Sequence, residues 1–87
     1  MTTATIFEQV RGIAADLFQV PAAQIIAESS PETLESWDSV QHLNLVLGLE
    51  QQFNIQFEPE EMDRMKTIGT VVELVASKLS VPPNLDP

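Results

Sequence analysis

The stretch SVQHLNLVLGLEQQF (residues 39 to 53) decides the fold, because its apolar residues recur at helical spacing. One face of this predicted helix collects Leu45, Val46, Leu49 and Phe53, and a neighbouring face collects Val40, Leu43 and Leu47. The apolar arc is wider than one packed surface needs, so we expect the second face to be partly exposed for a partner. Gly48 costs about 1 kcal/mol relative to Ala in a helix interior, and we expect its missing side chain to allow close packing.

Residues on the N-terminal side of this helix predict another helix and a long loop. A second amphipathic helix is predicted over residues 5 to 19, capped by a Thr near residue 3 or 5. Its inward stripe is Ile6, Val10, Ile13, Ala14 and Leu17. Residues 20 to 38 lack a sustained period and read as a loop, which we expect four apolar side chains to pin onto the core: Ile25, Ile26, Leu34 and Trp37.

Two further helices are predicted on the C-terminal side. Pro59 suits the first turn of a short helix, and residues 54 to 58 read as a connector without a partner strand. Thr67 is expected to cap a last helix, whose inward residues are Ile68, Val71, Val72, Val75 and Leu79. The predicted fold is all-α: three main helices and one short helix form a bundle over residues 1–80, with a flexible tail over 81–87.

Composition excludes several classes of function. Four basic residues against thirteen acidic ones give a net charge of −9, which disfavours nucleic acids and anionic membranes and favours proteins with basic patches. No stretch is long and apolar enough to span a membrane, and the N-terminus lacks a signal-peptide pattern. With no Cys, the chain has no disulfide or thiolate chemistry of its own. We expect a cytoplasmic monomer.

Nothing in the sequence predicts a catalytic or metal site. The only His, His42, follows Ser39 by three residues, but no oxyanion hole accompanies the pair, so we interpret His42 as a solvated polar residue. The acids between residues 58 and 63 lack the spacing and the Gly of a calcium loop. They read as a solvated acidic face or a docking patch. We therefore expect neither an enzyme nor a metal-binding protein.

The dipeptide Asp38-Ser39 has two interpretations. Asp38 can cap the helix, with the side chain of Gln41 reaching back in a variant of the capping box. Ser39 can instead be an attachment point, because the free amides and the dipole at a helix N-terminus favour a negatively charged group such as a phosphodiester. The residues alone leave both interpretations open.

In its order of elements the chain resembles the acyl carrier protein family, in the free-standing form, over roughly residues 4 to 80. The resemblance rests on a helix, a long loop, LESWDSV (residues 34–40), and then LVLGLEQQFNIQFEPEEM (residues 45–62). It implies that a phosphopantetheinyl transferase attaches 4′-phosphopantetheine to Ser39, with Asp38 setting the local environment. The arm would carry an acyl group as a thioester to enzymes of a biosynthetic pathway.

The same resemblance implies roles for further residues. A cargo pocket would be lined by Leu49, Phe57, Met62, Met65 and Val71, although each of them can equally be an ordinary core residue. The bulk of Phe57 and the two Met residues predicts a small cavity that suits short or polar cargo. Partners, including a loading ligase and acyl-transfer enzymes, would meet Trp37, Val40, Leu47 and Glu50. Acids stud this helix in the family, but only Glu50 remains here, so we expect a dedicated partner that recognises the chain by packing more than by charge.

Two other functions share these features. One is a peptidyl or aminoacyl carrier with the same arm, loaded by an aminoacyl ligase. The other is an acidic helical adaptor that is never modified, in which Ser39 only helps to start the helix. The sequence does not separate the carriers by cargo, whereas acceptance of the arm separates both carriers from the adaptor.

Overall fold

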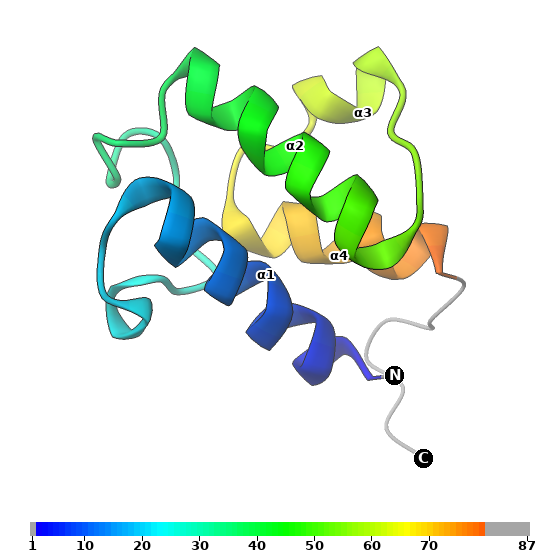
Figure 1. The fold of residues 1–87 in the computed structure, drawn as a ribbon, viewed down its shortest axis with the longest axis horizontal. Helices are drawn as coiled ribbons and strands as arrows, with labels where there is room; N and C mark the ends of the chain where they lie inside the picture. The colour runs from blue at the N-terminus through cyan, green and yellow to red at the C-terminus, as the bar shows by residue number, and fades with distance from the viewer. Residues whose placement is uncertain (1, 80–87) are drawn as a thin grey trace.

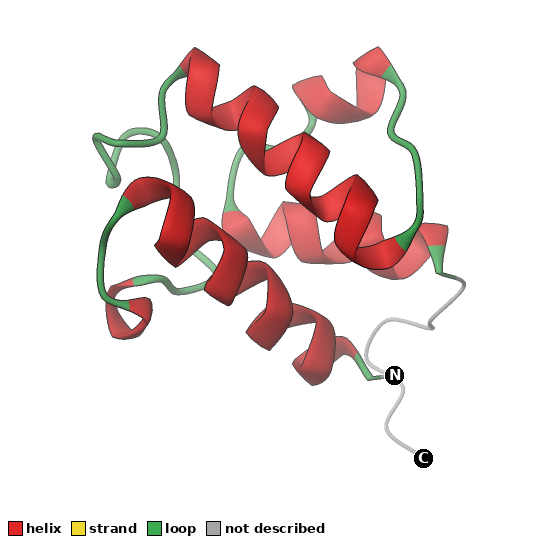
Figure 2. Ribbon diagram, in the orientation of Figure 1, coloured by secondary structure: helices red, strands yellow, loops and turns green. Residues whose placement is uncertain are grey.

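The computed structural model describes residues 2–79, which form four α-helices and one 3-10 turn (Figure 1). The order along the chain is α1 (Thr3–Phe18), η1 (Ala22–Gln24), α2 (Ser39–Phe53), α3 (Pro59–Asp63) and α4 (Ile68–Lys78). No strand occurs in this part of the chain (Figure 2). The predicted all-α bundle of three main helices and one short helix is confirmed. The predicted tail, residues 81–87, lies outside the described residues.

Helix α1 begins two residues earlier than predicted, because the Thr that caps it is Thr2. The side chain of Thr2 accepts a hydrogen bond from the amide of Thr5 at 3.1 Å. At the other end Gln19 adopts a left-handed conformation, with φ 57°, and its amide donates to the carbonyl of Ala15. The buried stripe is Ile6, Val10, Ala14 and Phe18, whereas the predicted Ile13 and Leu17 are half-buried.

Helix α2 has the two faces that its sequence period predicts. Leu45, Val46, Leu49 and Phe53 are buried, and the neighbouring face is exposed. α1 and α2 run side by side in opposite directions in Figure 1, and α1 also packs against α4. A Cβ at Gly48 would lie 3.3 Å from Cγ2 of Ile13 on α1. The missing side chain therefore permits the close approach of α1 and α2, as predicted.

The loop between α1 and α2 is anchored from inside and along its backbone. Ile25, Leu34 and Trp37 are buried as predicted, but Ile26 is 52% exposed, so its predicted place in the core is wrong. Two loop carbonyls also accept hydrogen bonds from amides in the first turn of α4. The amide of Ile68 donates to Ser29 at 2.9 Å and that of Gly69 to Ala27 at 2.8 Å. The loop is thus hydrogen-bonded to the N-terminus of α4.

The C-terminal half closes the bundle. Thr67 caps α4 by accepting from the amide of Thr70 at 3.1 Å, as predicted. The buried side of α4 is Ile68, Val71, Val72, Leu74, Val75 and Ala76, with the predicted Leu79 half-buried. The backbone of α3 comes less close to the other helices than α1 does to α2 or α4. α3 is therefore attached to the rest of the bundle mainly by side-chain contacts.

Candidate functional site

Ser39 is the first residue of α2, and it is exposed. The preceding Asp38 is the N-cap, whose Oδ1 accepts from the amide of Gln41 at 2.9 Å. The predicted capping box is wrong in one respect, because the side chain of Gln41 does not return to Asp38. Its Nε2 donates instead to the carbonyl of Leu17 at the end of α1, at 3.2 Å. The hydroxyl of Ser39 is thus not required for the cap.

The N-terminus of α2 is a favourable place for an anionic group. The first-turn amides of a helix have no intrahelical acceptor, and the helix dipole places positive potential there. Asp38 occupies only the amide of Gln41 with its carboxylate. The chemistry of an exposed hydroxyl beside these amides therefore fits a covalently bound phosphodiester.

Trp37 lies inside the fold, not on the surface. It is 2% exposed, and its ring stacks on Phe18 of α1 with the ring centroids 5.5 Å apart. A partner cannot pack directly on a side chain this covered, so the partner-facing role predicted for Trp37 is wrong. Its predicted role in pinning the loop is the one that the structure confirms.

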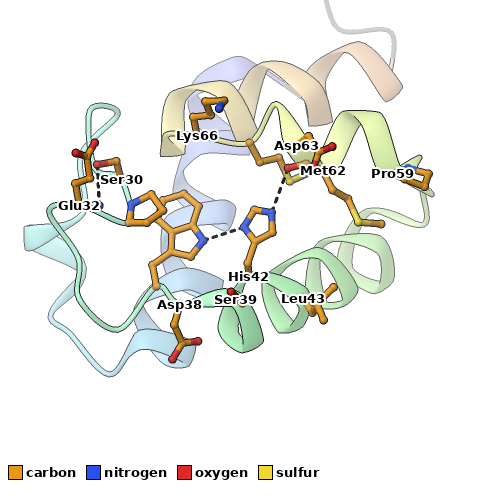
Figure 3. Close-up of a pocket in the computed structure, with 13 residues that line it drawn as sticks. Ser30, Glu32, Asp38, Ser39, His42, Leu43, Pro59, Met62, Asp63 and Lys66 are labelled. Carbon is orange, nitrogen blue, oxygen red and sulfur yellow. Dashed lines mark hydrogen bonds between the residues drawn. The ribbon is translucent and has the colours of Figure 1, made fainter.

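The indole of Trp37 also starts a hydrogen-bond chain through His42, which corrects the interpretation of His42 as solvated. Nε1 of Trp37 donates to Nδ1 of His42 at 2.9 Å, and Nε2 of His42 lies 3.2 Å from the carbonyl oxygen of Met62 on α3 (Figure 3). His42 is half-buried, and its ring stacks on the indole with centroids 6.0 Å apart. One imidazole therefore joins the loop, α2 and α3.

A groove with a volume of about 880 Å³ lies next to Ser39, between the loop, the start of α2 and α3 (Figure 3). Its apolar lining includes Trp37, Leu43, Met62 and Met65, and Ser39 and His42 also line it. Its charged lining residues are Glu32, Asp38, Asp63 and Lys66. A group attached to Ser39 would have this groove within immediate reach.

The residues predicted to shelter cargo fall into two places. Met62 and Met65 line the groove. Leu49, Phe57 and Val71 do not line it, and they are 0%, 6% and 0% exposed within the core. The structure therefore brings two of the five residues to the groove beside Ser39 and leaves three in the interior.

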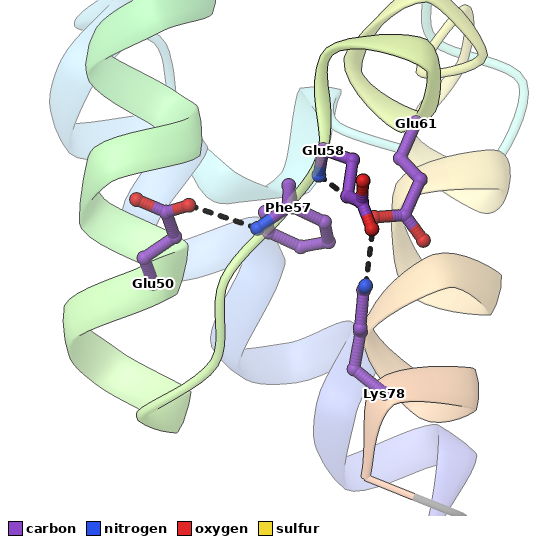
Figure 4. A network of polar contacts seen from close by, with 5 residues as sticks. All are labelled: Glu50, Phe57, Glu58, Glu61 and Lys78. Atoms are coloured by element: carbon purple, nitrogen blue, oxygen red, sulfur yellow. Dashed lines mark hydrogen bonds and ion pairs between the residues drawn. The ribbon is translucent and has the colours of Figure 1, made fainter.

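Glu50, the only acid within α2, is used inside the chain. It is half-buried, and its Oε2 accepts from the amide of Phe57 at 2.9 Å (Figure 4). Phe57 is buried in the connector between α2 and α3, so this bond fixes the connector against α2. Glu50 therefore has a structural role, and the partner-facing role predicted for it stays a prediction.

A second acid, Glu61, attaches α3 to α4. Its Oε1 lies 2.7 Å from Nζ of Lys78 and also accepts from the amide of Glu58 at 2.8 Å (Figure 4). The hydrogen bond from Lys78, followed by that from the Glu58 amide, lowers the pKa of Glu61 below its ordinary value of 4.5. The acidic stretch 58 to 63 is thus partly internal, and not only a solvated face.

The outer face of α2 is apolar and carries no free acid. Val40, Leu43 and Leu47 are 67%, 56% and 55% exposed, although large apolar side chains usually avoid water. Exposed neutral polar residues, among them Asn44 and Gln51, lie on the same helix. Within residues 2–79 no group of three or more acidic or His side chains could hold a metal ion. No helix there is long and apolar enough to cross a membrane.

Sequence reasoning missed the parts of the site that depend on contacts between elements. The bridging role of His42 is the main one, and its only signal in the sequence was Trp37. A buried indole N–H needs an acceptor, and His42 stands five residues further on. Phe18, which supports the indole, has the same apolar character as its neighbours in α1 and is not part of the predicted stripe.

Comparisons with known proteins agree with this geometry. The sequence model of a family described as the phosphopantetheine attachment site matches residues 8–76. The acyl carrier protein of Thermosynechococcus vestitus is 28% identical, covering 92% of this chain and 99% of that protein. The acyl carrier protein of Clostridium acetobutylicum is 33% identical, covering 80% of this chain and 91% of that protein. The solution structure of a holo acyl carrier protein from Geobacter metallireducens superposes with a TM-score of 0.77, at 28% identity and with 85% of each chain covered.

Proposed function

We propose that this chain, which belongs to the acyl carrier protein family, carries its 4′-phosphopantetheine on the hydroxyl of Ser39 and serves a dedicated biosynthetic pathway. The observation that carries the proposal is the exposed hydroxyl at the N-terminus of α2, beside a groove and after an anchored loop. The thiol of the arm supplies the thioester chemistry that a chain without Cys lacks. The chain itself is not a catalyst in this proposal.

Attachment exchanges the phosphoanhydride bond of coenzyme A for a phosphodiester bond to Ser39. The hydroxyl oxygen of Ser39 bonds to the phosphorus that bears pantetheine in coenzyme A, its proton passes to a base of the transferase, and adenosine 3′,5′-bisphosphate leaves. Asp38 keeps the first turn of α2 formed through its bond to the amide of Gln41. The first-turn amides then face the new phosphodiester, whose negative charge they stabilise.

Loading with coenzyme A tests the attachment. The protein is incubated with coenzyme A and a broad-specificity phosphopantetheinyl transferase, and its intact mass is measured. We expect a gain of one phosphopantetheine in the wild type and none in Ser39→Ala, which should fold normally because Asp38 supplies the cap. Failure of the folded wild type to gain the arm, or a gain in Ser39→Ala, would contradict the proposal.

The exposed face of α2 is the proposed docking surface for the transferase, a loading ligase and later acyl-transfer enzymes. The two sequence-predicted contacts that remain on the surface are Val40 and Leu47. Because the carboxylate of Glu50 binds an internal amide, recognition here depends on apolar packing more than on charge.

Truncation of one apolar side chain tests this surface. We expect Leu47→Ala to weaken binding to the transferase about tenfold, since the few side chains at the packed centre of an interface each cost more than about 1 kcal/mol when truncated. Gln51→Ala, an exposed change on the same helix, is the matched control and should leave binding unchanged. Binding that is strongly weakened by moderate salt yet indifferent to Leu47→Ala would count against apolar docking.

A further inference from the structure

His42 is half-buried and lines the groove beside Ser39, next to side chains that belong to the core of the bundle. It lines the groove together with Trp37 and Met65, which are 2% and 3% exposed and belong to the core cluster. In Figure 3 its ring extends from α2 across the gap toward Met62 on α3. His42, Trp37 and Met65 therefore form the side of the groove that adjoins the core.

Hydrogen bonds on both sides hold the ring in this place. Nδ1 accepts from the indole of Trp37 at 2.9 Å, and Nε2 lies 3.2 Å from the carbonyl of Met62. Moving the ring aside would leave the buried indole N–H without its acceptor, which is costly in an apolar surrounding. It would also release one of the contacts that attach α3.

We propose that His42 closes the inner side of the groove and so determines which acyl chains this carrier can shelter. An acyl chain carried by the arm stays in the groove or in solvent, because the route to Leu49 and Val71 leads through the imidazole ring. Short or polar acyl groups have little apolar surface to bury, so exclusion from the interior costs them little. Long aliphatic chains remain exposed to water. The inference rests on the proposed attachment at Ser39 and extends it to the class of cargo.

Two loaded forms of the protein test the position of the chain. Acetyl and octanoyl groups are transferred to the protein from the corresponding acyl-coenzyme A, and the methyl signals of Leu49, Val71 and Met62 are compared by NMR. In the wild type we expect the octanoyl group to shift the signal of Met62 in the groove and to leave Leu49 and Val71 as they are in the acetyl form.

Removal of the ring should open the interior. In His42→Ala we expect octanoyl to shift Leu49 and Val71 and to slow cleavage of the thioester by hydroxylamine about threefold or more, because the rate follows the exposed fraction. Gln41→Ala is the matched control, since it removes a side-chain bond from the same turn of α2 to the carbonyl of Leu17. It should behave as the wild type.

Each remaining outcome overturns the inference. Octanoyl that shifts Leu49 and Val71 in the wild type shows that the ring is no barrier, and this result needs no variant. A closed interior in His42→Ala, or an opened one in Gln41→Ala, removes the special role of His42. If His42→Ala does not fold, His42→Asn takes its place, because Asn is smaller and can still accept from Trp37. Failure of loading itself, seen in the intact mass, contradicts the attachment at Ser39 and the inference with it.

Discussion

At the scale of single residues, the bonds of His42 determine which of its nitrogens carries the proton. An indole N–H can only donate, so Nδ1 of His42 must accept from Trp37. The carbonyl of Met62 can only accept, so Nε2 must donate. The two contacts are satisfied together by one neutral tautomer, with its hydrogen on Nε2.

This tautomer can be measured directly. In the neutral ring we expect the nitrogen chemical shifts of His42 to identify Nε2 as protonated and Nδ1 as unprotonated, because each partner accepts only one arrangement. Trp37→Phe keeps a ring beside Phe18 and removes the indole donor, but the carbonyl of Met62 still accepts, so the hydrogen should stay on Nε2 in this variant as well. A wild-type ring protonated at Nδ1 would be incompatible with the hydrogen bond from Trp37.

At the scale of elements, Glu50 joins α2 to the connector that precedes α3. Loss of its carboxylate leaves the amide of the buried Phe57 without a partner. We expect Glu50→Ala to lower the free energy of unfolding by about 1 to 2 kcal/mol in chemical denaturation. Gln51→Ala, the exposed neighbour, should change it by less than about 0.5 kcal/mol. Equal effects of the two variants would mean that the bond does not hold the connector.

The pair Glu61–Lys78 makes the attachment of α3 depend on pH. The pKa of Glu61 is lowered from 4.5 in the folded state, so its carboxylate stabilises the fold above pH 4.5. That contribution disappears as the pH falls below 4.5 and through the folded pKa. We expect Glu61→Gln to be less stable than the wild type at neutral pH by up to about 1 kcal/mol, with the difference shrinking in acid. A difference that grows below pH 4.5 would have the wrong sign.

The elements also show what the sequence could predict and what it could not. The two faces of α2 follow from the helical period alone. A helix that packs on one side buries Leu45 and exposes Leu47. The partners of Gln41 and His42 lie 24 and 20 residues away along the chain. Such pairs depend on how α1 and α3 are placed against α2, which no local pattern encodes. The position of Ser39 at the start of α2 was predictable, because its signals, the onset of an apolar period and a preceding Asp, are local.

At the scale of the whole molecule, the excess of acid is the dominant property. Thirteen acidic residues stand against four basic ones. Among the described residues the ion pairs are Arg11–Glu8 and Lys78–Glu61, so most of the described carboxylates are in no ion pair. Repulsion between them opposes the compact state, and dissolved salt screens it.

This repulsion predicts how salt changes thermal stability. We expect Tm to rise by a few degrees when NaCl is increased from about 10 to 150 mM, because the screening length falls from about 30 Å to about 8 Å. The molecule measures 36 × 28 × 19 Å, so the shorter screening length weakens the repulsion between carboxylates on distant parts of its surface. Circular dichroism at 222 nm checks this. A Tm that falls with NaCl would show that the two ion pairs outweigh the general repulsion.

The anchored loop has a consequence for every enzyme that uses this carrier. Its carbonyls at Ala27 and Ser29 are bound to the start of α4, and Trp37 closes it from within. The backbone on either side of Ser39 therefore has little freedom to move toward a distant catalytic centre. Reach must come from the prosthetic group alone, so a partner's reaction chamber can be no deeper than that tether is long.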